Sequence, residues 1–519
     1  MATAVQGRAS RADEGAHLST DHLRSTIKSR TISGAVISGA TQSCQLVLTL
    51  TYGAVLARLL SPRDFGLVGM AMAVVGLLQI FKDAGLSTAT IQREEITKAQ
   101  VSNLFWLNVS VGAMAAFVIA IGAPGIGWFF REPELVGITL ALSSGFVLEA
   151  LAVQHCALLN RQMRFRVVSV IDVGSVAGGF VIGVVMAWLN WRYWSLVAAT
   201  LSTAAFRVVA MWTCCGWRPQ RPTRGAETRP LVKFGADLTL VGLLYALARG
   251  ADNLLIGRYL GAEAVGFYSR AAALLSKPLD RLIGPVFAVI VPALSRLQKD
   301  PDRYRTGFLQ VFEGLAIGGF VFTGVLLPLA RPVVICVLGQ KWDPVTPIFA
   351  VLVVAALFVP LTTATSWLYT SQGRGRELLL NVSIEAAVMV AAFAAGLTFG
   401  PTGVAIAYSG SGLLVRLPLT FYIAGRRGPV SVRDLWSASA RHLPVLVGVT
   451  GVTWLSATAS ATRLSPLGQL AFCMPLGALA GAGTAFMFPA TRRTVRRLVV
   501  AVTDLRKSDR PATPISAVS

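Results

Sequence analysis

Residues 103–123 have the sequence NLFWLNVSVGAMAAFVIAIGA, a stretch without a charged side chain. An α-helix rises about 1.5 Å per residue, so a helix of this length matches the hydrocarbon core of a bilayer, which is about 30 Å thick. A surface helix of a soluble protein would carry charged residues along its outward face. The segment is therefore predicted to cross a membrane as an α-helix, because a helix satisfies its own backbone hydrogen bonds in lipid.

Similar segments recur along the whole chain of 519 residues, which is 54% hydrophobic and only 14% charged. Fourteen can be marked, covering approximately residues 32–57, 65–82, 103–123, 135–158, 167–189, 193–216, 231–250, 264–292, 307–330, 345–370, 378–399, 401–424, 442–460 and 466–489. The connections between them are too short for a folded extramembrane domain. The expected fold class is all-α, a polytopic membrane protein with about 14 transmembrane helices.

The basic residues indicate how these helices are oriented. The chain has 47 Lys and Arg against 25 Asp and Glu, a net charge of +22. In a soluble protein this excess would suggest nucleic-acid binding, but in a membrane protein Lys and Arg collect in the cytoplasmic connections. With both termini in the cytoplasm, the opposite side holds only nine of them: Arg58, Arg63, Arg131, Arg192, Arg249, Arg258, Arg331, Lys341 and Arg463. We expect a multi-pass protein of the cell inner membrane, with cytoplasmic N- and C-termini and no nucleic-acid partner.

An internal repeat relates the two halves of the chain. Residues 58–73, RLLSPRDFGLVGMAMA, align without gaps to residues 258–273, RYLGAEAVGFYSRAAA, and RFR at 164–166 pairs more loosely with RGR at 374–376. Six spans separate the copies, so both point the same way through the membrane, which predicts a parallel repeat about an axis along the membrane normal. The expected organisation is a disordered basic cytoplasmic tail (1–30), an N-terminal six-helix lobe (31–216), a cytoplasmic linker (217–230), a C-terminal six-helix lobe (231–425), two extra transmembrane helices (426–490) and a basic cytoplasmic tail (491–519).

Some ionisable residues fall inside the predicted spans, where they are costly and usually face a cavity or a partner helix. Arg207 and Arg416 lie on the matching sixth and twelfth spans. Asp172 and Glu385 lie on the matching fifth and eleventh spans. Such paired positions suit a central cavity lined by both lobes, with the arginines as candidate substrate-cavity residues and the acids as candidates for H⁺ or Na⁺ coupling.

Two further arginines are candidates for the same cavity. Arg270 lies in the eighth span, and Arg249 lies at the outer end of the seventh, close to Asp252. The alternative for all these residues is that they form structural ion pairs between neighbouring helices, or that long side chains reach out to the membrane surface. Both interpretations stay open at the level of sequence.

Other kinds of site are not indicated. The six cysteines show no CxxC pairing, so neither a metal site nor a disulfide framework is expected. The sequence has no G-x-x-x-x-G-K-[ST] phosphate-binding loop, nucleophile elbow or zinc-protease helix, so no catalytic residue, metal or cofactor is expected.

Four stretches resemble a known family. They are LARLLSPRDFGLVGMAMAV (56–74), KDAGLSTATIQREEITKAQVSNLFWLN (82–108), ALLNRQMRFR (157–166) and DNLLIGRYLGAEAVGFYSRAAAL (252–274). They are similar to the polysaccharide biosynthesis branch of the multidrug/oligosaccharidyl-lipid/polysaccharide exporter superfamily. The resemblance implies two six-helix lobes around a cationic central cavity and two extra C-terminal helices.

The resemblance also implies a function. Its members are flippases for lipid-linked oligosaccharides in lipopolysaccharide, capsule or exopolysaccharide assembly, so the expected partners are a polyprenyl-pyrophosphate oligosaccharide, membrane lipids, and polysaccharide polymerase and export proteins. Movement by alternating access without catalysis is expected. The alternatives are a cation-coupled multidrug exporter of the same superfamily and a membrane polysaccharide polymerase or ligase, although the latter class usually has a large extracytoplasmic loop.

Overall fold

The computed structural model describes residues 27–78, 90, 96–222 and 229–497. Within these ranges every regular element is a helix, and none is a strand. Nine helices in the described part of the chain are long and apolar enough to cross a membrane. The protein is therefore an all-α polytopic membrane protein, as predicted from the sequence.

The predicted spans coincide with helices throughout the described chain. The first eight lie in α2 (Ile27–Leu59), α3 (Pro62–Leu78), α5 (Lys98–Phe130), α6 (Glu134–Arg161), α7 (Phe165–Trp188), α8 (Trp194–Cys214) and α9 (Arg229–Arg296). Two spans fall in α9, which is broken into two helices at Gly261 by its positive φ of 84°. The helix α2 already begins at Ile27, within the segment assigned to the N-terminal tail.

The remaining six predicted spans also coincide with helices, although several of these helices are interrupted. They correspond to α10 (Pro301–Leu326), α12 (Val345–Val353) with η4 (Val354–Leu357) and α13 (Val359–Ser371), α14 (Gly375–Gly396), α15 (Gly400–Ser411) with η6 (Gly412–Arg416) and α16 (Leu417–Gly425), α18 (Leu443–Ser460) and α19 (Pro466–Met487). Three short helices, α11 (Ala330–Val337), η3 (Gln340–Trp342) and α17 (Val432–Ala440), and the 3₁₀ turn η5 (Leu397–Phe399) lie between them.

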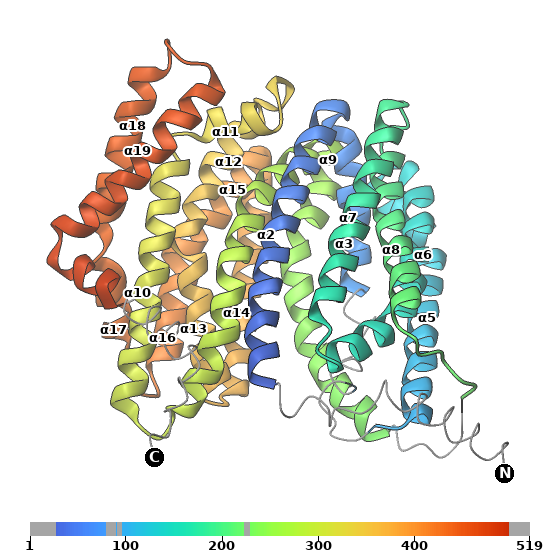
Figure 1. The fold of residues 1–519 in the computed structure, drawn as a ribbon. Helices are drawn as coiled ribbons and strands as arrows, with labels where there is room; N and C mark the ends of the chain where they lie inside the picture. The colour runs from blue at the N-terminus through green and yellow to red at the C-terminus, as the bar shows by residue number, and fades with distance from the viewer. Residues whose placement is uncertain (1–26, 79–89, 91–95, 223–228, 498–519) are drawn as a thin grey trace, which may run out of the picture. The chain divides into compact units, whose positions relative to one another are not determined.

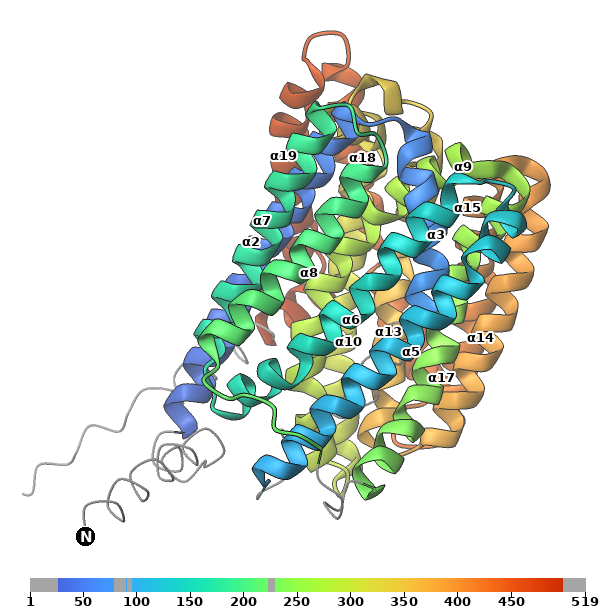
Figure 2. The same ribbon diagram turned by 90° about the vertical axis from the view of Figure 1, so that its right-hand side faces the viewer.

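Contacts divide the chain into two units, Met1–Ala273 with Phe393–Val404, and Leu274–Ala392 with Ala405–Ser519. In unit 1, α5 packs on α6, α7 packs on α8, and α8 also packs on α6, so that these helices lie side by side (Figure 2). In unit 2, α18 and α19 pack on each other, and both contact α10 (Figure 1). The predicted lobe boundaries remain a prediction.

The loose pairing of 164–166 with 374–376 corresponds to two turns of the same construction. Met163 and Gly373, the residues before the two motifs, have positive φ of 54° and 69°. The backbone N–H of Arg164 donates to Leu159 O, and that of Arg374 donates to Tyr369 O. Both pairs are related by an offset of 210 residues, so the repeat extends to individual hydrogen bonds.

The arginine that follows each positive-φ residue caps the end of another helix. Arg164 Nη1 donates to Cys214 O at 3.4 Å, and Arg374 Nη1 donates to Ala424 O at 3.4 Å. These carbonyls lie at the ends of α8 and α16, where a cation complements the negative end of the helix dipole. The same offset of 210 relates the two acceptors, which supports the repeat independently of the turn backbone.

One element departs from the common pattern. Residues Gly412–Arg416 form a π-turn between α15 and α16. A π-turn contains one residue more than an α-turn. The offset between the copies is accordingly 209 at Arg207 and Arg416 but 210 at Cys214 and Ala424.

Polar contacts in unit 1 group the connections at two ends. Arg63, before the second span, binds Glu132 at 2.6 Å and Glu134 at 3.2 Å. Arg192 lies 3.7 Å from Asp64, so the connections assigned to the outer side meet at one end. At the other end Trp106 Nε1 donates to Gln220 O (2.8 Å), which fastens residues 215–220 of the chain to α5. The grouping agrees with the alternation of predicted spans.

Candidate functional site

Two of the predicted site residues are brought together in unit 1. Arg207 on α8 lies with its Nε 3.0 Å from Asp172 Oδ1 on α7. Arg207 Nη2 also lies 3.8 Å from the sulfur of Cys156 on α6. The side chains of Arg207 and Asp172 are 38% and 27% exposed, so the pair borders an accessible surface. One candidate cavity cation and one candidate coupling acid thus neutralise each other.

A small hollow lies on the same face of these helices. It is partly open and is lined from α3, α6 and α8 by a mainly apolar set that includes Phe146, Glu149 and Thr200. Thr200 precedes Arg207 by two helical turns, and Glu149 precedes Cys156 by two turns, so the hollow and the ion pair face the same way. Both features therefore line one side of unit 1.

Arg270, also in unit 1, has no acidic partner among the described residues. Its guanidinium lies over the ring of Phe65, 4.5 Å from the centroid, and Tyr52 is its electrostatic neighbour. Its Nε is buried and finds no hydrogen-bond acceptor in the part of the chain that the structure describes. A cation–π contact contributes about 1–2 kcal/mol, which does not replace the hydration of a buried guanidinium. The charge is therefore only partly compensated.

Arg416 of unit 2 is in a comparable position. Its side chain is buried, at 6% exposure, at the end of the π-turn. Its Nη2 donates to Tyr408 O (2.8 Å), its Nη1 lies 3.5 Å from the sulfur of Met389, and its guanidinium lies over the rings of Tyr408 and Phe358. No acid in the described chain reaches it, so its positive charge is held by carbonyl oxygen, sulfur and aromatic faces alone.

Glu385 does not pair with Arg416, although its counterpart Asp172 pairs with Arg207. Its Oε1 instead accepts from Asn381 Nδ2, one turn earlier on α14 (3.0 Å), and from the hydroxyl of Thr420 on α16 (2.5 Å). The amide oxygen of Asn381 is buried and has no donor among the described residues. The side chains of Glu385, Asn381 and Thr420 thus meet between α14 and α16, and the amide of Asn381 keeps its oxygen free of a described donor.

Arg249 is the remaining candidate. Its backbone belongs to α9, but its side chain lies outside the described residues. Its role therefore stays a prediction from the sequence.

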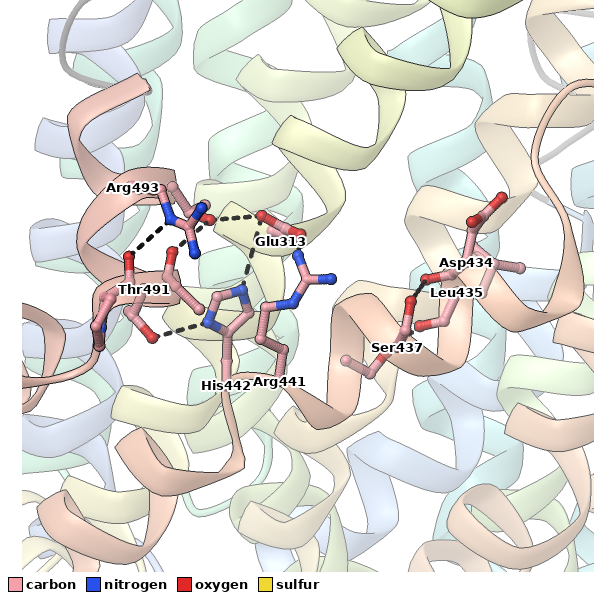
Figure 3. A network of polar contacts seen from close by, with 12 residues as sticks. Glu313, Asp434, Leu435, Ser437, Arg441, His442, Thr491 and Arg493 are labelled. Atoms are coloured by element: carbon pink, nitrogen blue, oxygen red, sulfur yellow. Dashed lines mark hydrogen bonds and ion pairs between the residues drawn. The ribbon is translucent and has the colours of Figure 1, made fainter.

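Sequence reasoning missed a polar network that ties the C-terminal helices to α10 (Figure 3). Glu313 on α10 accepts from Arg441 Nη1 (2.9 Å) and from Thr494 Oγ1 (2.5 Å), and His442 Nε2 lies 3.8 Å from it. The other ring nitrogen of His442 is 3.0 Å from the Thr491 hydroxyl. The position of Glu313 near the end of its span favours a structural ion pair, but nothing in the sequence indicates these partners.

Known proteins similar to the chain act in glycan assembly. Residues 55–347 match a family model described as polysaccharide biosynthesis protein. The lipopolysaccharide biosynthesis protein WzxC of Escherichia coli (strain K12) is 27% identical over 64% of this chain and 68% of its own length. The teichuronic acid biosynthesis protein TuaB of Bacillus subtilis (strain 168) is 26% identical over 70% and 77%, and the succinoglycan biosynthesis transport protein ExoT of Rhizobium meliloti (strain 1021) is 26% identical over 66% and 69%.

Solved structures with a similar fold are membrane transporters. The lipid II flippase MurJ, in an inward closed conformation, superposes with a TM-score of 0.67 at 13% identity, over 90% of this chain and all of that one. A multidrug resistance MATE family transporter in an inward-facing conformation superposes with a TM-score of 0.61 at 16% identity, over 78% of this chain and 99% of that one. At these identities the similarity establishes the fold.

Proposed function

The chain belongs to the polysaccharide biosynthesis protein family, and on this basis we propose that it is a flippase for a lipid-linked oligosaccharide. It moves a polyprenyl-pyrophosphate oligosaccharide across the cytoplasmic membrane, with both of its own termini in the cytoplasm, for lipopolysaccharide, capsule or exopolysaccharide assembly. Polysaccharide polymerase and export proteins would then act on the product. The protein is a transporter in this proposal and catalyses no covalent step.

The observation that carries the proposal is the pair of uncompensated arginines, Arg270 and Arg416. Neither has an acidic partner among the described residues, and the Nε of each is buried without an acceptor. A charge without an ionic partner inside a membrane protein is a functional-site candidate, because aromatic and carbonyl contacts offset only part of its cost. A pyrophosphate supplies the missing anion and matches the planar guanidinium with two hydrogen bonds.

The energetics favour outward transfer without nucleotide hydrolysis. A sugar pyrophosphate does not cross hydrocarbon unaided, since burying one isolated ion costs tens of kcal/mol in the idealised limit. Arginines in a wet cavity replace its hydration, while the polyprenyl tail stays in the lipid between helices. A cytoplasm that is electrically negative drives an anion outward by about 2.3 kcal/mol per charge per 100 mV. Rocking of the two repeated lobes then exposes the cavity to each side in turn.

A coupled ion would bind at Glu385. Carboxylate, amide and hydroxyl oxygens are the ligands that hard cations prefer, and the free amide oxygen of Asn381 provides an acceptor beside the Glu385 carboxylate. Asp172 is less suited, because Arg207 already occupies its Oδ1. We expect Na⁺ to raise the melting temperature of the purified protein, and Glu385→Gln to abolish that shift. The same shift with Glu385→Gln would remove Glu385 from ion coupling.

The proposal is tested in a strain that lacks the protein. Loss of a flippase leaves its lipid-linked oligosaccharide on the inner leaflet. This intermediate therefore accumulates, and the surface glycan disappears. Wild-type protein should restore export, and Arg270→Gln and Arg416→Gln should not. Unchanged glycan and no accumulated intermediate in the deletion strain would contradict the proposal, and increased sensitivity to cationic drugs would favour the multidrug exporter instead.

A further inference from the structure

The two copies of the internal repeat cross each other within unit 1 at two glycines. A Cβ placed on Gly66 of α3 would lie 1.6 Å from the carbonyl oxygen of Ala262 in α9. A Cβ placed on Gly266 would lie 2.0 Å from the carbonyl oxygen of Pro62. No side chain fits at either position, so the helices touch backbone to backbone.

These two contacts are the same contact seen from each copy. Adding 200 to Gly66 gives Gly266, and adding 200 to Pro62 gives Ala262, the register of the gapless repeat. Such reciprocity, in which residue i touches j' while i' touches j, defines an interface with two-fold symmetry. The crossing therefore lies at the axis that relates the copies. If both copies move symmetrically, the distance between α3 and α9 changes at this point.

The chemistry of the crossing allows it to separate. Small residues let helices approach closely in lipid, where their association depends on van der Waals contact and weak Cα–H···O bonds of about 0.5–1 kcal/mol each. No side chains interlock at the glycines. Next to the crossing, the guanidinium of Arg270 in the second copy lies over the ring of Phe65 in the first.

The position of the crossing fixes which side it closes. It lies at the start of α3, beside the break at Gly261 and the cluster in which Arg63 binds Glu132 and Glu134. These are the connections that the distribution of Lys and Arg assigns to the outer side.

We propose that the Gly66/Gly266 crossing is the outer gate of the protein, opened when the two repeated helices part. The inference rests on the proposed function, since a flippase has to open outward to release its cargo. Parting also withdraws Phe65 from Arg270, so an anion that binds the Arg270 guanidinium competes with the contact that helps to hold the gate closed. Gate opening and cargo binding are thereby coupled through one side chain.

The first test measures access and needs no substrate. The six native cysteines are replaced, Ser269→Cys is introduced as a reporter near the crossing, and a membrane-impermeant thiol reagent is added to intact cells. Gly66→Ala should increase the rate of labelling at least tenfold, because its methyl group cannot coexist with the Ala262 carbonyl. Gly76→Ala is the matched control, since Gly76 lies on the same helix with open space around it. Equal labelling in the two backgrounds would overturn the proposal, whatever the cargo is.

The second test locks the crossing. Gly69 and Ser269 are equivalent in the repeat, and a Cβ on Gly69 would lie 3.8 Å from Ser269 Oγ. Cysteines at both positions should form a disulfide on oxidation, and this disulfide should stop glycan export. Reduction of the disulfide should restore export. Each single cysteine variant should export under both conditions. The gate proposal would be contradicted if the oxidised pair exported glycan at the wild-type rate, or if the pair failed to cross-link. A deletion strain without glycan defects would contradict only the proposed cargo.

Discussion

Arg207 and Asp172 illustrate how one side chain can serve stability, function or both. Their ion pair is partly exposed, and water in the proposed cavity would screen it and limit its contribution to about 1 kcal/mol. From the sequence the two residues were placed on neighbouring spans and given separate roles, with an ion pair as the alternative. The spacing of residues along a helix does not reveal which of its faces turns toward the neighbouring helix.

A double-mutant cycle separates the two roles of Arg207. Arg207→Ala and Asp172→Asn should each lower the melting temperature of the detergent-solubilised protein by a few degrees, because each leaves a charge or a polar group without its partner. The double variant should recover that stability yet remain deficient in glycan export, since the proposed cavity would have lost a cation. Full export by the double variant would assign Arg207 a purely structural role.

Arg416 leads to the opposite expectation for stability. Because no described acid pairs with it, Arg416→Met removes a costly charge without leaving a buried carboxylate unpaired, and only the carbonyl of Tyr408 loses a donor. The melting temperature should stay constant or rise, while export falls at least tenfold, or about 1.4 kcal/mol in transition-state terms. Arg426→Met is the control, because Arg426 also lies over an aromatic ring but is exposed at the end of its helix. Loss of stability in Arg416→Met with normal export would contradict the proposed role of Arg416 in substrate binding.

At the scale of helices and turns, the sequence was a good guide to spans and a poor one to their interruptions. Each predicted apolar span coincides with a long helix or with a series of consecutive helices, since lipid allows few alternatives to a helix, but the short helices α11, η3 and α17 were not predicted. The π-turn before Arg416 has no signature in composition, and a regular period of 3.6 residues would place that arginine on another face. The sequence paired RFR with RGR only loosely, because the two motifs share only their arginines. It did not predict that the turns at Met163 and Gly373 have nearly the same conformation.

The two turns provide a matched pair for mutation. Arg374 donates to Arg427 O (2.7 Å), binds both oxygens of Glu377 and is 13% exposed, whereas Arg164 is exposed and makes one long bond to Cys214 O. Arg374→Ala should therefore cost about 2 kcal/mol of unfolding free energy, and Arg164→Ala less than about 0.5 kcal/mol. Denaturant or thermal unfolding in detergent measures the difference. Equal losses would mean that the capping bonds to the ends of α8 and α16, and not the additional contacts of Arg374, dominate.

On the scale of the whole molecule, the C-terminal helices are joined to α10 by residues that are remote in sequence. Glu313, His442 and Thr494 meet only after folding, so no local pattern could have predicted their contact (Figure 3). The same holds for the Gly66 crossing, whose partner lies 196 residues away at Ala262. The apolar segments predicted where the membrane helices lie along the chain, whereas long-range contacts depend on how those helices rotate and tilt.

Glu313 is expected to anchor the last two membrane helices. Glu313→Ala leaves Arg441 and the buried His442 without their acid, which should cost about 3 kcal/mol and loosen α18 and α19. Trypsin should then cut the connection after Arg426 and Arg427 several-fold faster. Asp302→Ala, an exposed acid on the same helix, serves as control and should not alter the cutting rate. Unchanged proteolysis in Glu313→Ala would show that apolar packing alone holds these helices.

The π-turn at Gly412–Arg416 has a consequence for how duplicated helices diverge. One residue added to a regular helix rotates everything after it by about 100°, and would turn Ala424 away from the arginine that binds its carbonyl. Widening a single turn confines the added residue, so the end of the helix keeps its place while Arg416 acquires an orientation that Arg207 does not have. One copy could thereby change the orientation of an internal arginine while the end of its helix kept the contact that the other copy also makes.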